Sequence, residues 1–165
     1  MVAHRDIGCF EMGRLRITGR LKEILVLSTA EKVAPGDLEM AITGDPLFEQ
    51  AMVVGDGKPH LCALLVVNRR AWDELCAGLG LASADPEAPA VATRAALERV
   101  AARLKPFPPY ARVRNVWLTL EPWSVEAGLI TPTMKLKREA LGRRFKEQIE
   151  MLYRDADRMS SRSTL

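Results

Sequence analysis

The sequence predicts an α+β fold, in which a small mixed β-sheet of about three main strands is flanked by helices and an N-terminal two-stranded hairpin stands apart. A continuous apolar run over Leu61–Val67 is typical of a strand that is buried on both faces. Apolar residues three or four positions apart, as in 91–105, indicate amphipathic helices. A length of 165 residues fits one domain with at most a small appendage.

The first expected elements are two short strands, 14–18 and 23–28, joined by a turn over 19–22. The first of them alternates polar and apolar residues, and the second is apolar and partly β-branched. A helix is expected from Pro35, since proline is favoured in the first helical turn, and Gly44-Asp-Pro46 should end it.

A β-hairpin is expected next, with strands 48–54 and 61–67 around a turn over 55–60. The second of these strands should be the central one, because it has no polar residue to place in solvent. A helix over 70–79 follows, and the composition of 82–90 is that of a loop.

The second half of the chain is expected to add a helix over 91–105, a strand over 113–120 and a last helix over 137–153. In that strand, Trp117 should face away from the apolar residues on either side of it. The polar tail beyond Arg154 is expected to fray. The inward residues of the last helix should be Leu141, Phe145, Ile149 and Leu152.

The composition is that of an ordinary soluble globular protein, with 48% hydrophobic and 27% charged residues. The cysteines, Cys9, Cys62 and Cys76, lack the spacing of a metal site, and Cys62 should be a buried, inert thiol. No segment approaches the ~20 apolar residues that span a bilayer. The start lacks the apolar region of a signal peptide. We therefore expect a cytoplasmic protein without a metal site.

Two basic segments carry the residues that could do chemistry, Gly19-Arg-Leu-Lys-Glu23 and Thr131-Pro-Thr-Met-Lys-Leu-Lys-Arg138. Lys135 follows a proline-containing turn just ahead of a helix, where a mobile ammonium group can stabilise a developing phosphate anion. Its alternative is a solvated lysine at a basic helix start. Arg20 could reach two hydroxyls or a phosphate with its forked guanidinium group, or it could be a surface arginine that pairs with a nearby glutamate.

Together the two segments resemble the C-terminal domain of adenylate-forming enzymes, most closely the AMP-forming long-chain fatty acid–CoA ligases (acyl-CoA synthetases). The resemblance covers roughly residues 6–153. In that family, a Thr-Pro-Thr-x-Lys-x-Lys-Arg segment supplies the lysine that bridges the acyl carboxylate and the α-phosphate. The resemblance therefore implies that Lys135 is the catalytic lysine of adenylation.

The N-terminal segment has the family's Gly-Arg-x-Lys-(Asp/Glu) pattern in full. The resemblance implies that Arg20 contacts the nucleotide ribose and that Lys22 is the hinge about which the domain turns between two half-reactions. Asp6 matches the family's ribose-binding aspartate, although His4-Arg5 stands where the family has Thr-Gly. An isolated aspartate before Ile-Gly can also simply begin a turn.

Ser28-Thr-Ala-Glu31 resembles the family's Ser-Gly-Gly-Glu loop, which lines the pantetheine tunnel during thioester formation. Thr29 and Ala30 replace both glycines, so side chains stand where the family has none. A plain connection between a strand and a helix is the alternative interpretation of Ser28, Thr29, Ala30 and Glu31.

The resemblance implies a division of the chain into the end of a linker (1–13), the lid domain (14–153) and a polar tail (154–165). The lid would serve an ATP-dependent ligase that uses ATP with Mg²⁺, a fatty acid and CoA. The phosphate loop, adenine pocket and acyl tunnel would lie in a larger N-terminal adenylation domain. We expect this chain alone to bind none of these cofactors and to be inactive.

Two other functions stay open at this point. One is a fatty acyl-AMP ligase domain that acts with an acyl carrier protein, motivated by Thr29 and Ala30. The other is a non-enzymatic basic interaction module. The basic run over 135–146 could bind nucleic acid or anionic lipid, but a charge run is usually a solvated helix face, and this one lacks the interleaved aromatic residues of a nucleic-acid site. If the run binds a ligand, the phosphates of CoA are the simplest candidate. We expect no nucleic-acid partner, whereas the intact enzyme could contact a membrane peripherally.

Overall fold

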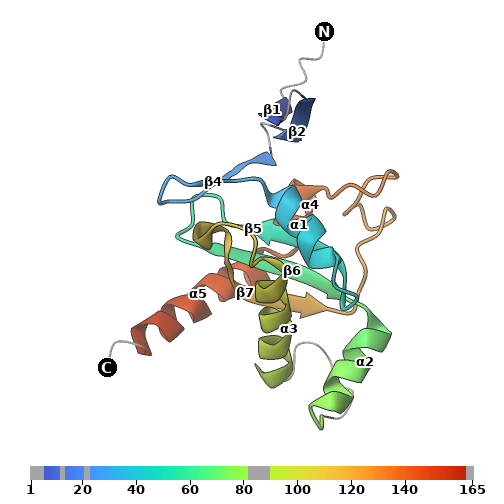
Figure 1. Ribbon diagram of the computed structural model, residues 1–165. Coiled ribbons are helices and arrows are strands. Elements are labelled where there is room, and N and C mark those ends of the chain that lie inside the picture. The colour runs from blue at the N-terminus through green and yellow to red at the C-terminus, as the bar shows by residue number, and fades with distance from the viewer. Residues whose placement is uncertain (1–5, 12–13, 21–22, 82–89, 163–165) are drawn as a thin grey trace.

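The computed structural model describes the backbone of residues 6–11, 14–20, 23–81 and 90–162, and the side chains of residues 23–81 and 90–154. The elements are β1 (Asp6–Glu11), β2 (Arg14–Arg20), β3 (Leu25–Val26), β4 (Lys32–Val33), α1 (Pro35–Thr43), β5 (Phe48–Val54), β6 (Leu61–Val67), α2 (Arg69–Gly78), α3 (Ala90–Arg103), the 3₁₀-helix η2 (Pro109–Ala111), β7 (Val113–Thr119), α4 (Arg138–Arg144) and α5 (Lys146–Arg162). Figure 1 labels most of them and colours the chain from blue at the N-terminus to red at the C-terminus.

The centre of the domain is a three-stranded mixed sheet in the order β5-β6-β7. β5 and β6 form the expected antiparallel hairpin, and β7 pairs parallel with β6. All seven residues of β6 are buried, which confirms it as the central strand. The α+β class and the small mixed sheet are therefore as the sequence predicts.

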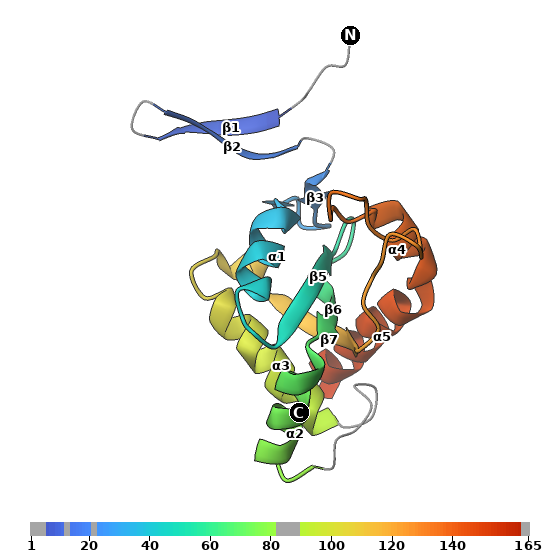
Figure 2. The same cartoon turned by 90° about the vertical axis from the view of Figure 1, so that its right-hand side faces the viewer.

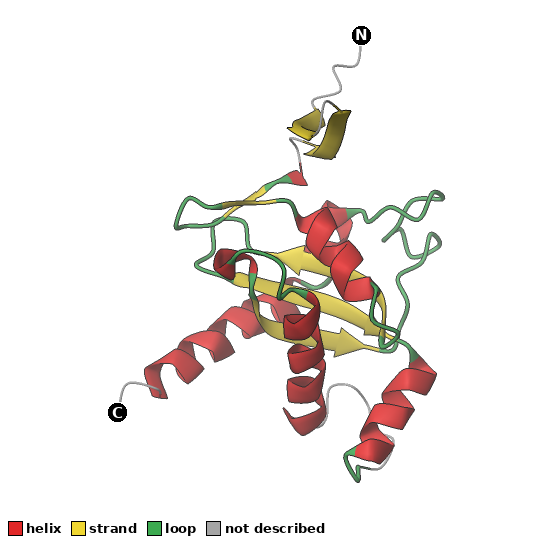
Figure 3. Cartoon of the chain, viewed as in Figure 1, coloured by secondary structure: helices red, strands yellow, loops and turns green. Residues whose placement is uncertain are grey.

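Helices cover both faces of this sheet, as Figure 3 shows, and alternate residues of β6 serve the two cores. One core packs against α1, α2 and α3 and takes Leu61, Ala63, Leu65 and Val67 from β6. The other packs against α4 and α5 and takes Cys62, Leu64 and Val66. Trp117 joins the second core while its neighbours in β7 join the first, as expected. Burial raises the pKa of the Cys62 thiol to about 11, which fits an inert thiol.

The N-terminal hairpin is present, but its strands differ from the predicted ones. β2 pairs antiparallel with β1, a strand that the sequence pattern did not indicate. The apolar segment 23–28 forms only the two-residue strand β3, which pairs with β4. Gly19 and Arg20 extend β2 rather than forming a turn. In Figures 1 and 2 the β1–β2 hairpin stands away from the body of the domain.

The last helix is also different, since α4 and α5 meet at Phe145 (φ −108°, ψ 26°) where one helix was expected. Phe145 lies 5.0 Å from Trp117 and 6.2 Å from Trp123, measured between ring centroids. The spacing of inward residues continues across this break, because Leu141 and Leu152 are buried in the same core. Apolar spacing alone could therefore not reveal it. α5 also runs on to Arg162, past the expected end.

The helices over 35–43, 69–78 and 90–103 and the strand over 113–119 agree with their predictions within a few residues. The predicted loop over 82–90 lies almost wholly outside the described residues. Among the helices that the structure describes, none is long and apolar enough to cross a lipid bilayer.

Candidate functional site

The segment that carries Lys135 is a closed loop between β7 and α4. Ile130 and Leu136 form an antiparallel bridge at its base, and the Lys137 N–H donates to the Leu129 carbonyl at 2.9 Å. Both Leu129 and Ile130 are buried in the second core. The base of the loop is therefore fixed to the domain while its tip faces solvent.

Thr131 organises the tip of this loop through four hydrogen bonds. Its backbone N–H donates to the Lys135 carbonyl, and its own carbonyl accepts from the Met134 N–H, both at 2.8 Å. Its hydroxyl oxygen accepts from the Lys135 N–H at 3.0 Å and bonds the Thr133 hydroxyl at 3.0 Å. Met134 takes a left-handed conformation, with φ of 63°. The backbone of Lys135 is thereby ordered.

The Lys135 side chain is exposed, and none of the ion pairs found among the described side chains includes it. An ordered backbone with an exposed ammonium group is what a lysine needs to reach a group held outside its own domain. The turn followed by a helix is as expected, since α4 begins at Arg138.

Arg138 does not belong to a solvated basic face, which corrects the interpretation of the basic run at this residue. Its guanidinium group donates to both carboxylate oxygens of Glu39 in α1, at 2.8 and 2.7 Å. Only 24% of the Arg138 side chain and 12% of the Glu39 side chain are exposed. The other basic residues of the run, Lys135, Lys137, Arg143, Arg144 and Lys146, are at least partly exposed.

Glu39 also accepts the backbone N–H of Val53 in β5, at 2.8 Å. Burial raises the pKa of Glu39 above its ordinary value, although the hydrogen bonds and the charge of Arg138 act in the opposite direction. One carboxylate therefore joins α1, β5 and the start of α4.

Ser28–Glu31 forms the tight turn between β3 and β4. The Leu27 N–H donates to the Glu31 carbonyl, and the Ala30 N–H donates to the Leu27 carbonyl, both at 2.9 Å. Ala30 has φ of 72°, a conformation that favours glycine. Ala30, one of the two residues that replace the family's Gly-Gly pair, thus occupies a backbone position suited to glycine.

The turn between β5 and β6 supports the turn over 28–31. The Lys58 carbonyl accepts the Ser28 N–H at 2.9 Å, and the Asp56 carboxylate accepts the Val26 N–H at 3.0 Å. At Gly55, an added Cβ would stand 2.6 Å from a methyl carbon of Leu61, so the Leu61 side chain would have to shift to admit a larger residue. The turn at 28–31 is therefore anchored to the central hairpin.

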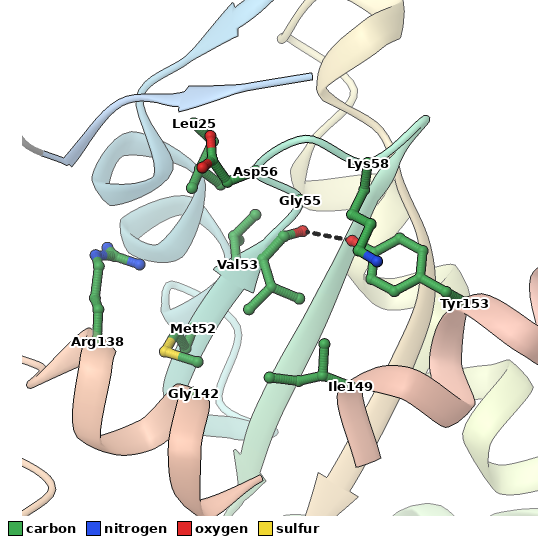
Figure 4. Close-up of a pocket in the computed structure, with 11 residues that line it drawn as sticks. Leu25, Met52, Val53, Gly55, Asp56, Lys58, Arg138, Gly142, Ile149 and Tyr153 are labelled. Atoms are coloured by element: carbon green, nitrogen blue, oxygen red, sulfur yellow. Dashed lines mark hydrogen bonds between the residues drawn. The ribbon is translucent and has the colours of Figure 1, made fainter. Parts of the chain in front are cut away.

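A pocket of about 210 Å³ lies between β3, the β5–β6 turn and the helices α4 and α5 (Figure 4). Met52, Ile149 and Tyr153 contribute apolar surface to it. Lys58 and Arg138 add charged groups, and the Lys58 ammonium nitrogen lies 5.1 Å from the centre of the Tyr153 ring. Leu25 and Arg138 of its lining lie near the 28–31 turn and the Lys135 loop in the chain, but none of the described lining residues belongs to the turn or to the loop.

Tyr153 closes one side of this pocket, and its hydroxyl group lies within hydrogen-bond distance of two carbonyls. It is 3.2 Å from the Val54 carbonyl, the bond drawn in Figure 4, and 3.1 Å from the His60 carbonyl. Burial raises the pKa of Tyr153, so the phenol stays protonated and donates. α5 thereby holds both ends of the β5–β6 turn.

The predicted nucleotide-binding residues lie on the N-terminal hairpin. Asp6 and Arg20 are directly paired across β1 and β2, so their backbones are brought together. Their side chains, and the predicted hinge residue Lys22, lie outside the described residues. The β3–β4 turn and α4 lie at the end of the domain from which this hairpin projects (Figures 1 and 2).

Sequence reasoning missed Glu39 and Tyr153. Each acts through a partner 93 to 99 residues away, so no local spacing could have indicated it. The local sequence gives one indication that Glu39 is partly buried: it directly follows Leu38, a core residue of the same helix that is 1% exposed. Among the described residues, no group of three or more metal-ligating side chains could hold a metal ion.

A protein-family model described as "AMP-binding enzyme C-terminal domain" matches residues 22–157, which is most of the chain. The chain belongs to this family. The resemblance of the chain to the C-terminal domain of adenylate-forming enzymes is therefore confirmed.

Several relatives of this AMP-binding C-terminal domain are fatty acid ligases. It is 32% identical over 157 residues to the long-chain-fatty-acid–CoA ligase FadD15 of Mycobacterium tuberculosis, covering 90% of this chain and 26% of that protein. It is 31% identical to the long-chain-fatty-acid–CoA ligase ACSBG2 of Gallus gallus, covering 92% of this chain and 23% of that protein. The long-chain-fatty-acid–[acyl-carrier-protein] ligase AEE15 of Arabidopsis thaliana is 28% identical, with 86% and 18% covered.

Solved structures of adenylate-forming enzymes share the fold. The adenylation domain of a carboxylate reductase from Mycobacterium chelonae matches with a TM-score of 0.77 and 28% identity, covering 90% of this chain and 22% of that one. The corresponding domain from Segniliparus rugosus, in complex with AMP and a co-purified carboxylic acid, matches with a TM-score of 0.75 and 25% identity, covering 92% and 23%. The chain spans about a quarter of the length of the curated relatives FadD15 and ACSBG2.

Proposed function

We propose that this chain is the mobile C-terminal lid of an ATP-dependent long-chain fatty acid–CoA ligase. In the first half-reaction, a fatty acid carboxylate attacks the α-phosphate of ATP, which yields acyl-adenylate and pyrophosphate. The Lys135 ammonium group would stabilise the negative charge between carboxylate and α-phosphate. The observation that carries this proposal is the exposed Lys135 side chain on a loop whose backbone is fixed.

In the second half-reaction, the thiol of CoA attacks the acyl carbonyl and AMP leaves. The lid would rotate about Lys22 and present Ser28–Glu31 to the pantetheine arm, with Asp6 and Arg20 contacting the ribose. Hinges of this kind are a few residues that absorb a change in φ and ψ. The anchored turn at 28–31 supports this assignment, because a surface that lines a narrow tunnel must keep its shape.

A larger adenylation domain, the fatty acid, ATP and CoA are the partners that this proposal requires. Mg²⁺ would accompany ATP as its phosphate complex. Within the part of the chain that the structure describes, no group of three or more ligating side chains could hold the ion. A cytoplasmic location and a peripheral contact of the intact enzyme with a membrane remain predictions from the sequence.

The proposal is tested by the activity of two polypeptides. One is the complete ligase that contains both the adenylation domain and this lid, called the full-length polypeptide below, and the other is this chain alone. With a long-chain fatty acid, ATP and CoA, the full-length polypeptide should form acyl-CoA, AMP and pyrophosphate. The 165-residue chain alone should show no ATP–pyrophosphate exchange. Exchange by the isolated chain, or absence of acyl-CoA formation by the full-length polypeptide, would contradict the proposal.

A second candidate acceptor is an acyl carrier protein. Two observations favour it: a relative is named as an acyl-carrier-protein ligase, and Thr29 and Ala30 place side chains where the family has glycines. A comparison of rates with free CoA and with a phosphopantetheine-bearing carrier decides between them. A higher kcat/KM for the carrier would favour this second function.

A further inference from the structure

A largely buried ion pair joins the two helices that follow the 28–31 turn and the Lys135 loop. α1 follows the 28–31 turn after β4, and α4 follows the Lys135 loop directly. Glu39 in α1 accepts two hydrogen bonds from Arg138, the first residue of α4, at 2.7 and 2.8 Å. It also accepts one from the Val53 N–H in β5.

The geometry makes this pair a rigid connection. A forked guanidinium–carboxylate pair fixes orientation as well as distance. With 12% of Glu39 and 24% of Arg138 exposed, little water competes for either group. Removal of one partner would leave the other as an uncompensated, largely buried charge.

The pair reaches Lys135 through the backbone of the loop. Arg138 lies three residues after Lys135, and the Lys137 N–H and the Ile130–Leu136 bridge close the loop just before α4. The position of α4 against α1 and β5 therefore sets where the base of the loop lies. Because the Lys135 N–H donates to the Thr131 hydroxyl oxygen, the position of the Lys135 backbone depends on the position of the loop base.

We propose that Glu39 is a positioning residue for Lys135, and that it acts through Arg138 by fixing the base of the lysine loop against α1 and β5. The inference rests on the proposed function of Lys135. Its consequence is selective: a loosened loop harms the half-reaction that needs the ammonium group in place, because a displacement of about 1 Å can cost about 10²-fold in rate.

The test uses Glu39→Gln in the full-length polypeptide. The amide oxygen of the substituted side chain would still accept the Val53 N–H, while the charge and one acceptor for Arg138 are lost. We expect kcat for adenylation to fall by about 10- to 100-fold with KM for ATP little changed. Thioester formation from supplied acyl-adenylate should be largely retained. Arg138→Lys, which keeps the charge but not the fork, should show a smaller loss with the same selectivity.

Asp45→Asn supplies the matched control. Asp45 has 10% of its side chain exposed and accepts two hydrogen bonds from Arg99 of α3, at 3.0 and 2.7 Å. This pair is also forked and partly buried, but it joins the end of α1 to α3 and does not involve α4. The control should therefore lower thermal stability without a selective loss of adenylation.

Hydrogen exchange of the Lys135 amide gives a readout that is independent of activity. Exchange should become faster in Glu39→Gln and stay unchanged in Asp45→Asn. An equal loss of both half-reactions in Glu39→Gln, or a loss of adenylation no greater than in the control, would overturn the inference. Lys135→Ala in the same assay separates the two proposals: if it leaves adenylation intact, the proposed function itself fails.

Discussion

Lys135 and Arg138 show how far single residues can be interpreted from sequence. The motif placed both in one basic run, and the structure gives them opposite environments: Lys135 is exposed, whereas Arg138 is ion-paired with Glu39. The exposure of Lys135 followed from its place after a turn. The pairing of Arg138 did not, since its partner is 99 residues away and becomes a neighbour only in the folded domain.

Ala30 gives a prediction at the residue scale. A side chain in the left-handed region costs about 1–2 kcal/mol, whereas glycine loses about 0.5–1 kcal/mol through its larger conformational entropy in the unfolded chain. With φ of 72° at this position, Ala30→Gly should raise the free energy of unfolding by about 0.5–1 kcal/mol. Urea unfolding of the 165-residue chain measures it.

Thr29→Gly is the control for this change, because Thr29 does not have positive φ. It should leave the free energy of unfolding unchanged or lower it. If both glycine variants stabilise the chain equally, the conformation of Ala30 is not the cause.

At the scale of elements, the strands and helices of the central body were predictable because the local sequence pattern of each is enough to indicate it. β6 is a continuous apolar run, and α1 begins at a proline and ends at Gly44. The β1–β2 pairing and the break at Phe145 were not predictable. The first depends on a partner strand with little apolar signal. The second interrupts no apolar spacing, because Phe145 still turns inward and its ring lies beside Trp117 and Trp123.

The Asp45–Arg99 pair gives a pH-dependent prediction for the packing of α1 against α3. Burial alone would raise the pKa of Asp45, but hydrogen bonds from Arg99 and from the Leu47 N–H outweigh it and hold the pKa below its ordinary value of 3.8. The carboxylate therefore stabilises the fold above pH 3.8, and this contribution is lost as pH falls through the folded-state pKa.

Asp45→Asn should lower the free energy of unfolding at neutral pH by about 1–3 kcal/mol. The difference from the unchanged chain should shrink as pH falls below 3.8. Urea unfolding over a range of pH measures both. A difference that stays constant from neutral to acid pH would show that the ionised pair is not its source.

At the scale of the whole molecule, one domain carries both segments to which we assign the two half-reactions. The Lys135 loop and the 28–31 turn are each anchored by hydrogen bonds. The lining of the pocket between β3 and α4 includes Leu25 and Arg138, which lie near these segments in the chain. The sequence predicted both segments through their motifs. The anchors between them, Glu39, Asp56 and Tyr153, come from long-range packing and were visible only in the structure.

The most direct measurement is the separation of the two half-reactions in the full-length polypeptide. Lys135→Ala should lower ATP–pyrophosphate exchange by about 10²–10³-fold, because it removes one group that stabilises the transition state. It should spare thioester formation from supplied acyl-adenylate. Lys22→Pro should do the reverse by stiffening the proposed hinge. If Lys135→Ala lowers both half-reactions equally, or neither, Lys135 does not have the role assigned to it.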